Sequence, residues 1–329
     1  MTDFKNRVFG CTIVKVINSN YNADFSGQPR TLPNGNCYAT DKAMKYPIRH
    51  YIRNVFINET VFYYKTYNEQ INPLSLDETY LKYFSDYRTI KIKQKKKGSD
   101  KEEIDKRDVA NKLLSCIDIR IFGATFACKT SNKSLKTNIS LHGPVQINHG
   151  VNIWTENNIY SEQILSPFSN KEDDSDSSDE KGMTTIGRQS KLEEGHYLHH
   201  FSVNPQNLRD MVALAGEGAQ SLSDEDIDKL KEAMRRGVTW YDSASKAGCE
   251  NEMLVWIQLK DGSKAVLPNL TSLIELSAQK ENGKYVYDMA KLSTKLSRFG
   301  EEIETIEVYY DAESVLLKNI PVGTKEMEL

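Results

Sequence analysis

The most constraining feature of the sequence is residues 38–55, whose charged and apolar side chains separate onto two faces if the segment folds as a helix. At 100° per residue, its cations fall within a sector of about 80° and its apolar side chains gather on another face. We therefore expect a helix that packs against the protein on one side and holds a row of cations outward on the other. The cations are Lys42, Lys45, Arg49 and Arg53, and the apolar residues are Met44, Ile48, Tyr51, Ile52 and Val55.

Cations repeated once per helical turn suit a line of phosphates better than a single small anion. Nucleic acid is therefore the first partner to consider, although an ordinary solvated helix face has the same pattern. Pro47 complicates the arrangement because proline removes a backbone donor and clashes with the preceding turn. A kink or a new helix start at Pro47 would blur the single cationic face.

Charge is unevenly distributed along the chain. The 329 residues have a formal charge of -3, but residues 1–97 contain 16 Lys and Arg against 8 Asp and Glu. Much of the remaining acidity belongs to residues 171–180, and we expect the surrounding loop, 169–183, to be mobile because it has nothing apolar to bury. A local excess of positive charge beside the expected helix is typical of a nucleic-acid groove.

Composition indicates an ordinary soluble globular protein, with 39% hydrophobic and 27% charged residues. The five cysteines form no close pair, which is a poor basis for disulfides and favours a reducing compartment. No apolar run reaches the roughly 18 residues of a membrane span, and the N-terminal residues are too polar for a secretory signal. We therefore expect a cytoplasmic protein with no membrane partner.

Strand and helix signals interleave without a regular repeat, which favours an α+β fold with helices on one face of the sheet. The sequence predicts a strand over 7–17, then a turn-rich loop, then the cationic helix. The charged stretch 91–107 is expected to be an exposed insertion. Further strands are expected at 116–127, 142–154, 197–203, 252–260 and 303–310, and helices at 108–114, 223–236 (with Ser223 as its cap) and 288–299.

Seven short motifs occur in order along the chain, each weak alone but specific as a series. They are Asn18-Ser-Asn-Tyr-Asn-Ala-Asp24, Thr40-Asp-Lys42 with Lys45 and Ile48-Arg49, Asp118-Ile-Arg-Ile-Phe-Gly123, Gly143-Pro-Val-Gln146, Ile186-Gly-Arg188, Gly195-His-Tyr197 and Asp242-Ser-Ala244. With them the chain resembles the Cascade backbone subunit of type I CRISPR systems, most closely its type I-B branch. That subunit belongs to the repeat-associated RNA-binding (RAMP) superfamily.

The resemblance implies a single domain over 1–329, built on a modified RRM (ferredoxin-like) antiparallel sheet with insertions. It implies a hand-shaped molecule in which the guide RNA lies across the sheet and a thumb-like hairpin lies within 155–195. It further implies a non-catalytic subunit, without cofactor, that forms a helical filament of its own copies along CRISPR RNA and binds other Cascade subunits. Target DNA would pair with the exposed guide bases, and a separate helicase-nuclease would be recruited to cut it.

A scaffold that accepts any guide sequence should hold phosphates and sugars in preference to base edges. By the resemblance, Ile186 is assigned to wedging beside a kinked base. Taken alone, residues 18–20 fit an ordinary turn as well as a phosphate contact, and residues 184–191 fit a surface loop. The residues expected to bind RNA are Asn18, Asn20, Arg30, Lys42, Lys45, Arg49, Arg53, Ile186, Arg188 and Lys191.

Alternative functions are also open at this point. Backbone subunits of type III effectors carry a loop aspartate that cleaves target RNA with a divalent metal, and Asp24 is the candidate here. A turn role for Asp24 and a helix-cap role for Asp41 are the favoured interpretation. The histidines at 196, 199 and 200 have no acidic or thiol partner at ligand spacing, so no metal site is expected. The acidic loop could instead recruit a basic protein partner.

Overall fold

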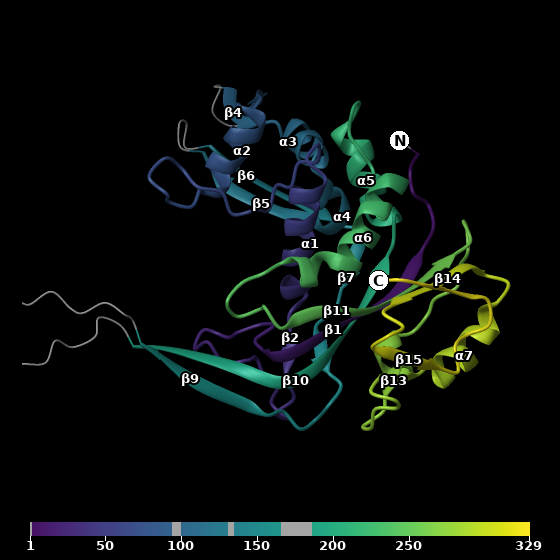
Figure 1. The fold of residues 1–329 in the computed structure, drawn as a ribbon. Coiled ribbons are helices and arrows are strands. Elements are labelled where there is room, and N and C mark those ends of the chain that lie inside the picture. The colour runs from purple at the N-terminus through teal and green to yellow at the C-terminus, as the bar shows by residue number, and fades with distance from the viewer. Residues whose placement is uncertain (1, 94–99, 131–134, 166–185) are drawn as a thin grey trace, which may run out of the picture.

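A central sheet, antiparallel across its middle strands, organises the protein (Figure 1). The computed structural model describes residues 2–93, 100–130, 135–165 and 186–329. Strand β1 (Val8–Ser19) lies between β10 (Ile186–Val203) and β11 (Cys249–Leu259) and is antiparallel to both. The full order is β16-β14-β11-β1-β10-β8-β2, with β7 and β9 also paired to β10. The bounds are β2 (Tyr38–Ala39), β7 (Val145–Ile147), β8 (Gly150–Asn152), β9 (Ile159–Leu165), β14 (Ile303–Tyr310) and β16 (Thr324–Met327).

Strand β1 is buried on both faces, which explains its run of β-branched residues. Because side chains alternate along a strand, Val14 and Val16 face one side, whereas Cys11 and Ile13 face the other. Helices α1 (Asp41–Val55) and α6 (Asp224–Trp240) cover the first face. The second face is covered by a small sheet and α7, so the prediction of helices on one face is incomplete. These elements are β12 (Glu275–Leu276), β13 (Tyr285–Asp288), β15 (Val315–Lys318), α7 (Ala290–Leu296) and the 3-10 turns Leu270–Leu273 and Ser297–Phe299.

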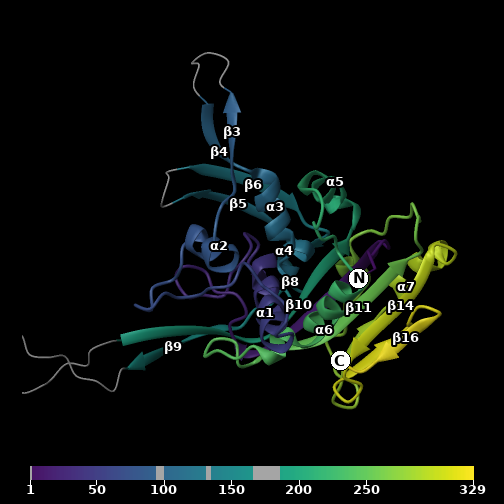
Figure 2. The same ribbon diagram turned by 90° about the horizontal axis from the view of Figure 1, so that it is seen from above.

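A third hydrophobic cluster forms a separate lobe above the sheet. Figure 2 shows the β3–β4 hairpin extending from this lobe. The hairpin occupies the stretch expected as a charged insertion, of which residues 94–99 lie outside the described residues. The lobe contains α2 (Leu76–Phe84), β3 (Thr89–Lys93), β4 (Asp100–Ile104), α3 (Lys106–Leu114), α4 (Ile117–Phe122), β5 (Gly123–Lys129), β6 (Lys136–His142) and α5 (Gln206–Ala215).

Helix α1 is continuous through Pro47 and packs on α6. The two helices approach closely there, because a Cβ added to Gly237 of α6 would lie 3.1 Å from the Pro47 carbonyl oxygen. Thr40 is the residue that precedes the helix and Asp41 is its first residue, so the expected cap role of Asp41 is wrong by one position. The cations of α1 therefore lie on one uninterrupted helix.

The strand predicted over 116–127 is wrong in its first half, because residues 117–122 form helix α4 and β5 begins only at Gly123. Every residue of α4 is buried, including Asp118 and Arg120. Both charges are paired inside the protein, Asp118 with Arg49 and Arg120 with Asp226. Alternating apolar and charged residues usually indicate a half-exposed strand. Here the same pattern belongs to a short helix whose charged residues form buried ion pairs.

Most other predicted elements are confirmed, and the α+β class is correct. The strands expected at 7–17, 252–260 and 303–310 are β1, β11 and β14, and the expected helices are α3, α6 and α7. Ser223 caps α6 as predicted, since its hydroxyl accepts a hydrogen bond from the Asp226 amide at 3.1 Å. All five cysteines are free. Within the described ranges, no helix has the length and apolarity needed to cross a membrane.

Strand β10 is 18 residues long and belongs both to the β9–β10 hairpin and to the central sheet. Its second part pairs with β1, and its first part pairs with β9 in a hairpin that projects beyond the sheet (Figures 1 and 2). This hairpin lies within residues 155–195, where the thumb-like region was expected. The predicted mobile loop 169–183 lies outside the described residues.

Replacing Gly10 of β1 with alanine should destabilise the fold. The added Cβ would lie 2.0 Å from Cζ of Phe201 and 2.5 Å from the carbonyl oxygen of Val255, and β1 is held by a strand on each side. We expect the free energy of unfolding to fall by about 1–3 kcal/mol in urea denaturation. Gly300→Ala is the control, because nothing lies within 4 Å of its added Cβ. Equal stability of the two variants would contradict this packing.

Candidate nucleic-acid interface

The loop after β1 is fixed between the start of α1 and the base of the β9–β10 hairpin. Asn22 Oδ1 accepts hydrogen bonds from the amide and the hydroxyl of Thr40, at 3.0 and 3.1 Å. Asn20 Nδ2 donates to the carbonyl oxygen of Ser190 in β10 at 3.1 Å. These bonds bring three parts of the chain that are distant in sequence to one place.

The two loop asparagines predicted to bind RNA are both engaged within the protein. Asn20 is only 3% exposed, and its Nδ2 donates to the carbonyl oxygens of Gly27 and Ser190. Asn18 is exposed, with a φ of 49°, and its Oδ1 accepts a hydrogen bond from the Tyr160 hydroxyl at 3.0 Å. Asn18 therefore holds the end of β1, and Asn20 the loop that follows it, against the hairpin. The side-chain amide of Asn20 could donate to RNA only if its bonds to Gly27 and Ser190 broke. RNA binding by Asn18 stays a prediction.

The four cations of α1 do not form the uniform outward row that the sequence predicts. The side chain of Lys42 is 86% exposed, but those of Lys45 and Arg49 are only 13% and 17% exposed. Lys45 Nζ lies 3.0 Å from Asp41 Oδ2, and Arg49 Nε donates to Asp118 Oδ2 at 3.1 Å. The outward orientation is therefore wrong for Lys45 and Arg49, because each is drawn toward a carboxylate of the protein.

An aromatic ring supports both inward cations. Lys45 Nζ is 5.4 Å and Arg49 Cζ is 5.1 Å from the ring centroid of Phe122, the last residue of α4. Cations at such distances are attracted to the ring face. Their charges are therefore held near the surface by the lobe and do not move freely in solvent.

Asp118 anchors this arrangement from a fully buried position. Its carboxylate accepts hydrogen bonds from the backbone amides of Phe62 and Tyr63, at 2.7 and 3.0 Å, and from Arg49. Three donors thus satisfy a buried charge that would otherwise be costly. The side chain connects α4, the loop after α1 and α1 itself.

Sequence reasoning missed a group of rings beside these cations, which we call the aromatic patch. It consists of Tyr46, His50, Tyr64 and Tyr241. The ring centroid of His50 lies 4.3 Å from that of Tyr46 and 4.6 Å from those of the other two members. Burial among these rings, together with the nearby charge of Arg53, lowers the pKa of His50 to about 4, so its imidazole is neutral at pH 7.

A sequence signal for the patch was present at Tyr46. At 100° per residue, this tyrosine falls on the same side of the helix as Lys42 and Arg53. Arg53 itself lies over a patch ring, with its Cζ 3.9 Å from the Tyr64 centroid. The exposed part of α1 is therefore a mixture of cations and aromatic rings.

The remaining predicted cations lie on the loop and on the hairpin. Arg30 is half-buried, with its Cζ 6.0 Å from the ring centroid of the exposed Phe25. Lys191 Nζ lies 3.3 Å from Glu162 Oε2 on the neighbouring strand, and Arg188 is exposed further along the hairpin. Ile186 begins β10, but its side chain lies outside the described residues.

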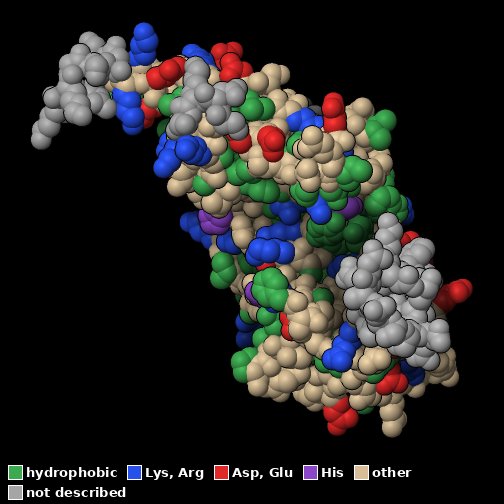
Figure 3. Space-filling model, turned by 90° about the vertical axis from the view of Figure 1, so that its left-hand side faces the viewer, with side chains coloured by type: hydrophobic (Ala, Val, Ile, Leu, Met, Phe, Trp, Pro, Cys, Tyr) green, Lys and Arg blue, Asp and Glu red, His purple; other side chains and the backbone are tan. Residues whose placement is uncertain are grey.

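Figure 3 shows the side of the molecule on which these elements meet. Lys and Arg side chains gather there in a hollowed band between the lobe above and the part of the molecule below it. The hydrogen bonds of Asn20 and Asn22 bring the first loop, the start of α1 and the hairpin base together. No bond within the described residues joins Arg188 to α1, so the structure does not unite all ten predicted residues.

Asp24 occupies a tight turn. Its Oδ1 accepts hydrogen bonds from the hydroxyl and the amide of Ser26, at 2.7 and 2.8 Å, and from the amide of Gln28 at 3.0 Å. The Ser26 hydroxyl bond in particular lowers the pKa of the Asp24 carboxyl. The part of the chain that the structure describes contains no group of three or more His, Cys, Asp or Glu residues able to hold a metal ion.

The neighbouring histidines of β10 are also engaged inside the protein. His196 is buried, with Nδ1 at 2.6 Å from Glu252 Oε2. His199 is buried too, and its Nε2 lies 3.2 Å from the Tyr21 hydroxyl. His196 therefore connects β10 with β11, and His199 connects β10 with the loop after β1.

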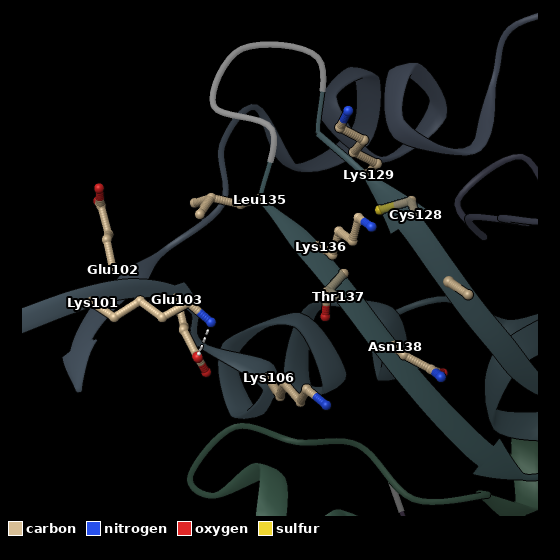
Figure 4. Close-up of a pocket in the computed structure, with 11 residues that line it drawn as sticks. Lys101, Glu102, Glu103, Lys106, Cys128, Lys129, Leu135, Lys136, Thr137 and Asn138 are labelled. Atoms are coloured by element: carbon tan, nitrogen blue, oxygen red, sulfur yellow. Dashed lines mark hydrogen bonds and ion pairs between the residues drawn. The ribbon is translucent and has the colours of Figure 1, made fainter. Parts of the chain in front are cut away.

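A second cationic hollow lies in the separate lobe, between β4, β5, β6 and α3 (Figure 4). It has a volume of about 650 Å³. Within it, Lys101 Nζ lies 2.8 Å from Glu103 Oε1. The lysines that line it are Lys101, Lys106, Lys129 and Lys136. Positive charge therefore gathers on more than one surface of the protein.

Comparison with known proteins gives a family match and a fold match. Residues 6–296 match a family model described as CRISPR-associated protein Cas7. A solved chain described as "CRISPR RNA-guided surveillance complex, pre-nicking" is similar in fold, with a TM-score of 0.51, 10% identity, and coverage of 98% of this chain and 96% of that chain. For another, described as "CRISPR RNA-guided surveillance complex", the TM-score is 0.49 and the identity 12%, covering 98% of this chain and 94% of that one. No curated protein matches the sequence.

Removing the Asp118 carboxylate should be strongly destabilising. Asp118→Ala leaves two backbone amides and the Arg49 guanidinium without their acceptor, so we expect the free energy of unfolding to fall by about 3–5 kcal/mol. Chemical denaturation followed by circular dichroism measures this loss. Asp210→Ala is the matched control, because its side chain is 87% exposed and should contribute almost nothing. A loss no larger than that of the control would rule out the anchoring role.

Proposed function

Because the chain belongs to the family of CRISPR-associated protein Cas7, whose model matches residues 6–296, we propose that it is an RNA-binding backbone subunit of a Cascade-type surveillance complex. In this role, copies of the chain assemble along CRISPR RNA and contact other subunits of the complex. The type I-B branch is the finer assignment that the sequence motifs support. The observation that carries the proposal is the mixed cationic and aromatic surface of α1, joined to the first loop and the hairpin base.

The strand order supports an RRM-like core. The sheet contains, side by side and in this order, β11, β1, β10 and then β7 or β8. In the sequence, α1 follows β1, and α6 lies between β10 and β11. This is the order expected of a βαββαβ, ferredoxin-like unit. An RRM normally binds single-stranded RNA across the open face of its sheet. Here both faces are covered, so we place the RNA along α1 and the first loop in place of the sheet itself.

The exposed Lys42 and the half-buried Arg53 suit recognition of any guide sequence. Lys42 is largely in solvent, and Arg53 lies at the other end of the same helix. Fifteen residues of helix at about 1.5 Å each span roughly 20 Å, which is enough for several phosphates. Contacts to phosphates carry no sequence information, which matches a scaffold for variable guides. The bases are then left to pair with target DNA.

The projecting hairpin supports a hand-shaped subunit that touches its neighbour. It reaches away from the sheet that holds the first loop, and Arg188 is exposed on it (Figure 1). We propose that this thumb contacts the RNA bound by the next copy, as the filament requires. Recruitment of a separate helicase-nuclease would then supply the cutting activity, and the subunit itself would be non-catalytic.

Replacing Lys42 and Arg53 with glutamine should weaken RNA binding equally for all sequences. The slope of log affinity against log salt for single-stranded RNA should become shallower by about 0.7 for each phosphate contact removed. Fluorescence anisotropy with labelled oligonucleotides of unrelated sequence measures both effects. Lys264→Gln is the control, because this exposed lysine lies on a loop beside the opposite face of the sheet. An unchanged salt slope in the double variant would disprove the assigned surface.

A non-catalytic subunit should leave complementary RNA intact. We expect the assembled particle to produce no cleavage of complementary RNA in Mg²⁺, because the Asp24 carboxylate is committed to its turn. Denaturing gel electrophoresis of labelled RNA, with Asp24→Ala and the exposed turn residue Asp261→Ala in parallel, tests this. Periodic cuts that disappear only in Asp24→Ala would establish the type III-like alternative.

A further inference from the structure

We propose that the aromatic patch is a stacking platform for an unpaired nucleobase of the bound single-stranded RNA, with Tyr46 as the ring that contacts the base. The inference rests on the proposed RNA-binding function and adds a contact to a base where only phosphate contacts were expected. It is carried by the exposure of Tyr46, by the rings that support it and by the cations on either side of it.

Tyr46 is exposed in the middle of the cationic face. It retains 41% of its accessible surface although it is packed against other rings. Lys42, with its side chain 86% exposed, lies one helical turn before Tyr46, and Arg53 lies about two turns after it. A strand held by these two cations would therefore pass the tyrosine ring.

The ring is held in place before any ligand arrives. Tyr241 meets it edge to face with the centroids 5.2 Å apart, and the two hydroxyls lie 3.4 Å apart. His50 lies against it at 4.3 Å. Tyr241 is the capping residue that follows α6, and Tyr46 and His50 lie on α1, so the platform stands where two packed helices meet. Binding to a ring that is already ordered costs little conformational entropy.

The chemistry favours a nucleobase over an apolar protein segment as the occupant. The neutral His50 adds an uncharged ring to the patch, while the positive charges stand at its edges. Stacking on an aromatic ring tolerates every base, because each base has a π-face. Such a contact stays compatible with guides of any sequence, and the cations would attract the phosphates on either side.

The test compares two oligonucleotides that differ only in their bases. Anisotropy titrations would use an oligouridylate and an abasic oligonucleotide with the same number of phosphates. We expect Tyr46→Ala to weaken binding of the oligouridylate by about fivefold or more, the loss typical of one stacked base. Binding of the abasic oligonucleotide should not change. Tyr46→Phe should bind both probes like the original protein, because it keeps the ring.

Other results of these titrations are also informative. Lys42→Gln should weaken both probes by the same factor, since it removes a phosphate contact. Equal losses for both probes in Tyr46→Ala, or a Tyr46→Phe variant that behaves like Tyr46→Ala, would overturn the stacking role in favour of a structural one. A Tyr46→Ala variant that keeps both affinities but loses self-association would assign the patch to a second copy. If the original protein binds neither probe, the proposed function fails as well; if it binds both equally, only this inference fails.

Discussion

The burial of β1 on both of its faces is the constraint on which the rest of the structure depends. A strand without a solvent face needs a covering layer on each side, and α1 with α6 provide one while α7 with the small sheet provide the other. This arrangement removes the open sheet face that RRM-like proteins generally use for RNA. The RNA-binding surface that we propose therefore lies at the edge of the α1 layer, where the first loop, α1 and the hairpin base meet.

Buried ion pairs then fix the lobe against this layer. Helix α4 contributes Asp118 to Arg49 of α1, and Arg120 to Asp226 of α6 at 2.8 Å. Arg120 is 2% exposed and Asp226 is 1% exposed, so neither charge tolerates loss of its partner. Two neighbouring residues on one short helix thus hold both helices of the covering layer. The position of the lobe above α1 is specified by charge as well as by apolar contact.

Much of this could be predicted from local pattern, and two of the failures share a cause. The periodicity of residues 38–55 correctly predicted a helix, which the structure places at 41–55, and the cap motif correctly located the start of α6. The inward position of Arg49 could not be predicted, because its partner lies 69 residues away in sequence. The same buried partner made α4 look like a half-exposed strand. Helical or strand periodicity does not reveal charge pairs between residues distant in sequence. Such a pair caused both errors, the outward position of Arg49 and the strand assigned to α4.

The continuity of β10 has a mechanical consequence. Leu192, which is fully buried, is paired with Ser19 of β1 on one side and with Ile159 of β9 on the other, so the sheet and the hairpin share this residue. A slip of one residue would turn Leu192 out of the core, which prevents the hairpin from sliding along the sheet. The backbone of β10 runs without a break from the described part of the hairpin into the central sheet. The described part of the hairpin is therefore fixed in register relative to the sheet, and Leu192 is the residue that sets it.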